Sequence, residues 1–115
     1  GVRHASDLAY ADYIRNELPK HEFLGEQISR QLLYYPAVSR EEHPHHGRLT
    51  TLMDSGKLYK DLDVPPLDPE TDRVMICGSP GMLRDLKTML QARGFKEGNT
   101  STPGAFVIER AFAEQ

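Results

Sequence analysis

Two arginines and a serine are the side chains best suited to binding a charged ligand. Ser39 and Arg40 follow a short apolar run, and Arg48 lies further along in a polar, histidine-rich stretch. A guanidinium offers planar, paired donors that match a phosphate, and a hydroxyl adds another contact. The alternative, which the residue types alone favour, is that both arginines are ordinary solvated side chains on the surface. The pattern makes a phosphate monoester the candidate ligand.

A second candidate site follows the apolar run Val74-Met75-Ile76. Cys77 and Gly78 end this predicted strand, and Ser79 begins a predicted helix. Ligands of open α/β sheets bind outside the carboxyl ends of strands and near helix N-termini. Glycine permits close backbone approach, and a polarizable sulfur packs well on a ring. The alternative is a buried strand cysteine; a nucleophilic cysteine is disfavoured, because no histidine is close in sequence.

The histidines and acidic pairs carry weaker signals. His43, His45 and His46 lack the second ligand pair of a structural zinc site, so we expect a mobile, solvated loop without metal. Asp61-Leu62-Asp63 and Asp68-Pro69-Glu70 read as surface turns, not as an acid–base pair.

The elements that must position these residues alternate between helix and strand. Strands are predicted at 73–78 and 105–110, and Ser79 with Pro80 gives the N-cap and first residue of a helix over 80–93. Helices between strands without hairpin turns indicate a parallel α/β sheet.

The first half is expected to add further elements. A helix capped by Ser6 over 6–18 would turn Tyr10, Ile14 and Leu18 toward the sheet. A strand over 32–38 would pair in parallel with the other two strands, although Pro36 suggests an edge position. Shorter helices are expected at 22–30, 49–54 and 58–63.

Composition excludes several classes of protein. The 115 residues make one domain or a piece of one, and 38% apolar with 27% charged residues is ordinary for a globular chain. A net charge of −3 disfavours nucleic acid, and no apolar run is long enough for a membrane span. A single cysteine excludes an internal disulfide and is compatible with the cytoplasm. The start at Gly1 without Met suggests a trimmed or excised chain.

Four segments, taken together, carry a family resemblance. In order they are Gly1-Val2-Arg3 before Asp7-Leu8-Ala9-Tyr10, Tyr34 to Glu41, Gly47-Arg48-Leu49-Thr50, and the Cys-Gly-Ser-Pro turn with the Glu-Arg-Ala-Phe ending. In this order and spacing the chain resembles the C-terminal NADP-binding domain of bacterial ferredoxin–NADP reductases.

The resemblance implies roles for the candidate phosphate-binding residues and for the residues at the end of the 73–78 strand. Ser39, Arg40 and Arg48 would hold the adenosine 2′-phosphate of NADP, and Arg3 would add a contact there. Cys77 and Gly78 would lie beside the nicotinamide and the flavin. The remaining implied NADP contacts are Thr50, Ser79 and Met82, the last with helix core as its alternative.

The C-terminal tail would contact FAD. By the resemblance, Ala111 lies over the isoalloxazine, Phe112 lies against the adenine, and Glu114 assists proton or charge balance. Phe112 as an ordinary terminal core residue is the alternative.

The family's FAD-binding β-barrel and glycine-rich first strand–helix unit have no counterpart here. The chain is therefore expected to be an incomplete, Rossmann-like α/β fragment whose open sheet edge is covered by the missing FAD domain or another chain. The implied function is hydride transfer between NADPH and FAD, coupled to ferredoxin or flavodoxin. The rivals are a reductase component of an oxygenase system and a non-catalytic nucleotide-binding or assembly module.

Overall fold

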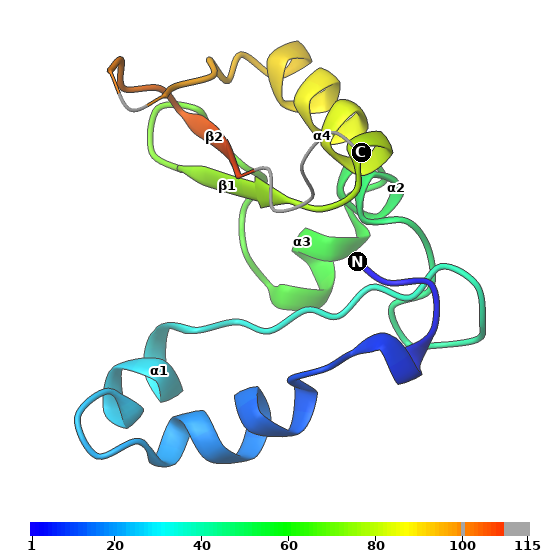
Figure 1. Cartoon of the computed structure of the whole chain (residues 1–115), viewed down its shortest axis with the longest axis vertical. Helices are drawn as coiled ribbons and strands as arrows, with labels where there is room; N and C mark the ends of the chain where they lie inside the picture. The colour runs from blue at the N-terminus through cyan, green and yellow to red at the C-terminus, as the bar shows by residue number, and fades with distance from the viewer. Residues whose placement is uncertain (100, 110–115) are drawn as a thin grey trace. The chain divides into compact units, whose positions relative to one another are not determined.

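The structure is a computed structural model that describes residues 1–99 and 101–109 (Figure 1). It divides into two compact units, Gly1–Val64 and Pro65–Gln115. Each unit is described by itself. Within the described residues, no helix combines the length and the apolar character needed to cross a membrane.

The second unit contains a parallel pair of strands. Strand β1 (Val74–Cys77) pairs with β2 (Phe106–Glu109) in parallel, in a register that sets Val74 opposite Phe106 and Cys77 opposite Glu109. The predicted parallel pairing of these two segments is therefore confirmed.

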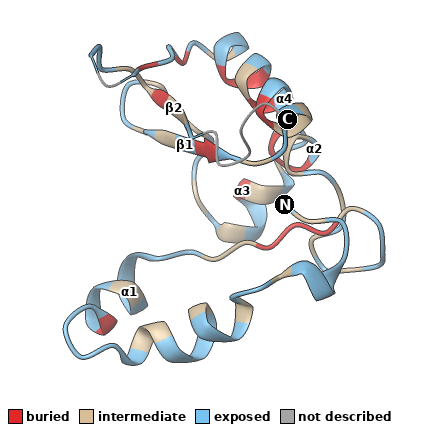
Figure 2. Cartoon of the chain, viewed as in Figure 1, coloured by how far each residue is buried: buried red, intermediate tan, exposed pale blue. Residues whose placement is uncertain are grey.

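Helix α4 (Pro80–Ala92) connects the two strands in sequence and carries the apolar face of this unit. The Ser79 side chain caps it by accepting a hydrogen bond from the backbone N–H of Met82 at 3.4 Å. After Arg93 the chain turns at Gly94, whose φ of 89° suits glycine. Buried side chains of the unit come from the helix, from both strands and from the segment after the helix (Figure 2): Ile76, Leu83, Leu86, Met89, Leu90, Phe95 and Phe106.

The first unit is built from short helices and extended segments. Its α-helices are α1 (Gly25–Gln31), α2 (Leu49–Asp54) and α3 (Lys57–Leu62). A 3₁₀-helix spans Ala5–Asp7, a π-helical turn Tyr13–Glu17 and a second 3₁₀-helix Leu18–Lys20. The expected helix over 49–54 is thus confirmed with its bounds, and those near 22–30 and 58–63 exist with shifted ends.

The expected continuous helix over 6–18 is wrong. His4, not Ser6, precedes the first short helix, and Asp7 accepts a hydrogen bond from the His4 backbone N–H at 3.3 Å. Tyr10 is 71% exposed, and Ile14 and Leu18 are only partly buried. Since most helical stability comes from packing an apolar face, spacing alone does not sustain a regular helix here.

The expected strand over 32–38 is also wrong. The segment is extended, but only Val38 forms bridges, one to Val2 and one to His46. Pro36 has no N–H to donate, and the leucines at 32 and 33 are exposed. A β-type sequence without a continuous partner therefore stays an unpaired extended segment.

Candidate functional site

Backbone hydrogen bonds bring Arg3 and Arg40 onto neighbouring segments of the first unit. The N–H of Val2 donates to the carbonyl of Ala37 at 2.8 Å, and the N–H of Ser39 donates to the carbonyl of Val2 at 3.0 Å. The Arg40 N–H then donates to the Arg3 carbonyl at 2.9 Å. The N-terminal segment with Val2 and Arg3 and the start of the polar loop are thus joined directly.

Arg48 is brought to the same place by the far end of the loop. The N–H of Val38 donates to the His45 carbonyl at 3.0 Å, and the N–H of Gly47 donates to the Val38 carbonyl at 2.8 Å. Gly47 has a φ of 133°, and Arg48 follows as the residue that precedes α2. Residues 39–47 therefore form a loop that is closed at its base, which we call the 39–47 loop.

The three arginines on these linked segments have side chains available for an anion. Arg3, Arg40 and Arg48 are all exposed. None makes a side-chain hydrogen bond or ion pair with another residue in the described part of the chain. Ser39 is partly buried beside them, and Thr50 lies in the first turn of α2. Unpaired cations and hydroxyls on linked segments suit a phosphate dianion.

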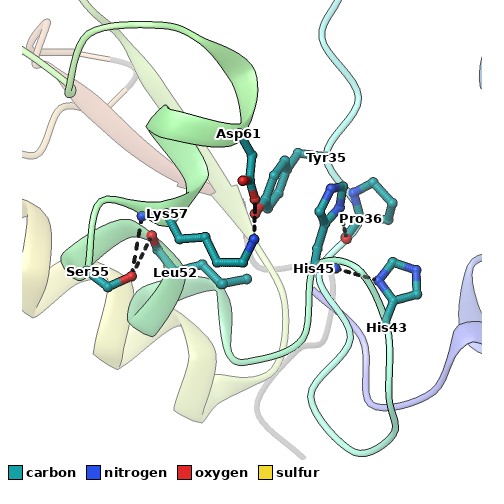
Figure 3. Close-up of polar contacts among 8 residues, drawn as sticks. All are labelled: Tyr35, Pro36, His43, His45, Leu52, Ser55, Lys57 and Asp61. Carbon is teal, nitrogen blue, oxygen red and sulfur yellow. Dashed lines mark hydrogen bonds and ion pairs between the residues drawn. The ribbon is translucent and has the colours of Figure 1, made fainter.

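A polar network that sequence reasoning missed stands next to this loop (Figure 3). The Tyr35 ring stacks on the His45 ring, with centroids 3.9 Å apart and planes 12° apart. The Tyr35 hydroxyl donates to Oδ2 of Asp61 at 2.6 Å, and Nζ of Lys57 donates to the same oxygen at 2.6 Å. The i, i+4 spacing of Lys57 and Asp61 was the available signal.

This network shifts the titration of its members. Loss of hydration, together with the hydrogen bond to Asp61 and its negative charge, raises the pKa of Tyr35 to about 12. The hydrogen bond from Lys57, followed by that from Tyr35, lowers the pKa of Asp61. Tyr35 is therefore a neutral donor and Asp61 a charged acceptor over the physiological range.

The sequence predicts that the histidines lie in a mobile, solvated loop. In the structure, hydrogen bonds hold them in place. Nδ1–H of His45 donates to the Pro36 carbonyl at 2.8 Å, and the His45 backbone N–H donates to Nδ1 of His43 at 3.0 Å. Nδ1–H of His46 donates to the Glu41 carbonyl at 2.7 Å. Among the described residues, no group of three or more His, Cys, Asp or Glu side chains is placed to hold a metal ion.

The second candidate site lies where β1 leads into α4. Cys77 is exposed, so the alternative of a buried strand cysteine does not hold. A Cβ on Gly78 would lie 2.6 Å from the sulfur of Met82, so the Met82 side chain lies directly against the Gly78 backbone. Met82 is partly buried, and its N–H is bound by Ser79. The structure thus joins Gly78, Ser79 and Met82 in one turn, with an accessible thiol beside them.

The implied FAD contacts all fall on the C-terminal tail. Ala111, Phe112 and Glu114 lie outside the described residues. Arg3, Arg40 and Arg48, which we call the arginine group, belong to the first unit. The turn formed by Cys77, Gly78, Ser79 and Met82, which we call the Cys77 turn, belongs to the second.

Comparison with known proteins gives close relatives. No family model matches the chain. The chain is 49% identical to ferredoxin–NADP reductase of Pseudomonas aeruginosa over 116 aligned residues, which cover 100% of the chain and 45% of that protein. It is 50% identical to ferredoxin–NADP reductase A of Sorangium cellulosum over 96% of the chain and 40% of that protein.

A solved structure agrees with these relatives. A ferredoxin–NADP⁺ reductase from Neisseria gonorrhoeae, crystallised with bound FAD and NADP, matches with a TM-score of 0.58 and 29% identity. The match covers 67% of this chain and 32% of that protein. It confirms the expected fold class, a partial Rossmann-like α/β domain with a parallel sheet.

The chain spans less than half the length of the curated relatives that it matches, and the matched region is their C-terminal part. The chain therefore corresponds to the C-terminal part of bacterial ferredoxin–NADP reductases.

Proposed function

We propose that this chain is the NADP-binding portion of a flavin-dependent ferredoxin (flavodoxin)–NADP reductase, in which hydride passes between NADPH and FAD. One observation carries the proposal. Three exposed guanidinium groups without described partners, those of Arg3, Arg40 and Arg48, stand on segments that backbone hydrogen bonds hold together. The relatives' names and the bound NADP of the Neisseria enzyme support it.

The chemistry of this donor set fits the 2′-phosphate of NADP. That group is a dianion on the adenosine ribose, and NADH has a hydroxyl in its place. Arg40 and Arg48 bind the phosphate oxygens, Ser39 donates its hydroxyl, and Arg3 adds positive charge from the neighbouring segment. Thr50 contributes a hydroxyl from the first turn of α2. The result is selection of NADPH over NADH.

In the second unit, we assign the Cys77 turn to the nicotinamide. Gly78 presents backbone with no side chain of its own, and the exposed Cys77 thiol supplies a small apolar surface for a ring. Ser79 fixes the start of α4, and Met82 fills the space against Gly78. When bound, the flavin supplies the redox chemistry, while this turn orients the nicotinamide and excludes water.

The remaining parts of the proposal concern what joins this chain. Residues 1–115 form the C-terminal part of an NADP-binding domain, and an FAD-binding domain is supplied from outside them. We assign the FAD contacts to Ala111, Phe112 and Glu114. Ferredoxin or flavodoxin exchanges electrons with the flavin, in the cytoplasm; a relative from Rhodobacter capsulatus is named flavodoxin/ferredoxin–NADP reductase.

The test is a flavin spectrum of the intact protein followed by anaerobic titration with NADPH and, separately, NADH. The proposal expects bound flavin that NADPH bleaches faster than NADH does. A colourless protein that still binds NADP would point to the non-catalytic module. A flavoprotein reduced preferentially by NADH would contradict the 2′-phosphate site and favour the oxygenase-type reductase.

A further inference from the structure

Four residues connect the 39–47 loop to the helix α3: Tyr35, His45, Lys57 and Asp61. We call them the Tyr35 clamp. They come from the extended segment before the loop, from the loop itself and from α3 (Figure 3). All four lie in the first unit, together with the arginine group. No role assigned above to nucleotide binding uses them.

His45 is the contact between the loop and the rest of the clamp. One face of its ring is stacked on Tyr35 at 3.9 Å, and Nδ1–H is held by the Pro36 carbonyl at 2.8 Å. Because the Pro36 carbonyl accepts a hydrogen bond, Nδ1 carries the proton. The ring is therefore fixed both in position and in rotation, and with it the backbone two residues before Gly47.

Tyr35 is in turn held by a hydrogen bond to a residue of α3. Its hydroxyl donates to Asp61, whose carboxylate also accepts from Lys57, so that α3 holds the ring on which His45 rests. Tyr35 stays protonated well above neutral pH, which preserves the donor. The clamp thus runs without a break from α3 to the loop that carries Arg40 and ends before Arg48.

We propose that His45 and Tyr35 are positioning residues for the 2′-phosphate site, holding the 39–47 loop in its binding conformation before the nucleotide arrives. The inference rests on the proposed function. An unfastened loop would have to be ordered on binding, at a cost in affinity, and a loop that is already ordered avoids this cost. Because the loop carries Ser39 and Arg40 and leads directly into Arg48, the benefit belongs to ligands that bear the 2′-phosphate.

The experiment measures binding of adenosine 2′,5′-bisphosphate and adenosine 5′-monophosphate to the intact protein by calorimetry. His45→Ala removes both the stack and the Nδ1 donor; His45→Phe retains the stack; Tyr35→Phe retains the ring and cuts the link to Asp61. His45→Ala is expected to lower the bisphosphate-to-monophosphate affinity ratio by about 2- to 10-fold, and the two conservative variants by less. Hydrogen exchange of the loop amides should speed up in the same order.

Two controls separate positioning from general damage. His21→Ala makes the same change in the same unit, at a histidine whose Nδ1 accepts from the N–H groups of Phe23 and Leu24. Lys60→Met removes a lysine from the same helix as Lys57, without a described ion pair. Both should leave the affinity ratio unchanged.

The outcomes are distinct. An unchanged ratio in His45→Ala and Tyr35→Phe, with a collapsed ratio in Arg40→Ala/Arg48→Ala, overturns the inference and leaves the proposed function standing. An unchanged ratio in the arginine variant overturns both. Equal loss of both ligands in the clamp variants also overturns the inference, because it means general damage. If His45→Ala fails to fold, the ratio in His45→Phe and Tyr35→Phe decides.

Discussion

At the residue scale, one carboxylate accepts the hydrogen bonds that connect α3 to Tyr35, beside the 39–47 loop. Asp61 accepts from both Tyr35 and Lys57 through the same oxygen. The sequence suggested only a surface turn at this position, because the partner tyrosine is distant along the chain. The Tyr35–Asp61 contact depends on the folded chain, and pattern reading has no means of finding it.

The raised pKa of Tyr35 gives a direct prediction. Tyr35 should ionise near pH 12, after an ordinary tyrosine, which ionises at about 10. Because its folded pKa lies above its unfolded pKa, its contribution to stability is complete below about pH 10 and is lost as the pH rises to about 12. Ultraviolet titration of the protein against Tyr35→Phe isolates this group.

Asp61→Asn should lower the Tyr35 pKa part of the way, since the negative charge is lost while the burial remains. Asp63→Asn, a neighbouring carboxylate without a described partner, is the matched control. Ionisation of Tyr35 at pH 10 in the unaltered protein would contradict the hydrogen-bonded geometry.

At the element scale, helices and strands that nearby residues specify can be predicted from the sequence better than those that depend on distant contacts. Helix α4 could be predicted because Ser79, Pro80 and the apolar spacing all lie within the helix or directly beside it. The expected helix over 6–18 and strand over 32–38 depended on partners elsewhere, and Tyr10, Leu32 and Leu33 are left exposed. Periodicity predicts which face can be buried; a packing partner decides whether the element forms.

The start of α4 offers a stabilising change and its opposite. A Cβ on Gly81 would meet only Arg84, at 3.8 Å, so Gly81→Ala should raise the free energy of unfolding by up to about 1 kcal/mol. Ser79→Ala removes the cap and should lower it by about 1 kcal/mol. Urea unfolding of both variants measures the difference, and a destabilised Gly81→Ala would mean that α4 begins later than described.

The loop before β2 should tolerate no side chain at Gly98. A Cβ there would collide with the backbone nitrogen of Gly104, and backbone cannot move aside as a side chain does. Gly98→Ala should therefore lower the free energy of unfolding by about 1–3 kcal/mol. Thermal unfolding checks this, with Gly81→Ala as the glycine-to-alanine control; equal stability of the two variants would contradict the close approach.

At the scale of the whole molecule, the candidate sites are divided between two units. Donor chemistry and the family resemblance make Ser39, Arg40 and Arg48 candidates from the sequence alone. The contacts among Tyr35, His45 and Asp61 could not be predicted, because stacking and side-chain hydrogen bonds between distant residues leave no periodic trace. Among residues 65–99 and 101–109 the second unit also has only two paired strands, fewer than independent stability usually requires.

Exposed apolar side chains predict how the 115-residue chain behaves when produced alone. Phe23 is 81% exposed and Leu33 is 55% exposed, both in the first unit. The isolated chain should self-associate, and Phe23→Glu with Leu33→Lys should reduce the association. Sedimentation velocity over a range of concentrations measures this. A monomeric unaltered chain at all concentrations would contradict the prediction.

The central claim is that Arg40 and Arg48 select NADP by its 2′-phosphate, and the ratio of kcat/KM for NADPH to that for NADH tests it most directly. Each charge-assisted contact contributes about 1.5–3 kcal/mol, or roughly 10- to 150-fold. Arg40→Ala/Arg48→Ala should therefore collapse the ratio, mainly through KM for NADPH, with NADH turnover nearly unchanged. Arg30→Ala, at an exposed arginine paired with Glu26 in α1, should leave the ratio unaltered. An unchanged ratio in the double variant would contradict the account and return both arginines to the solvated surface.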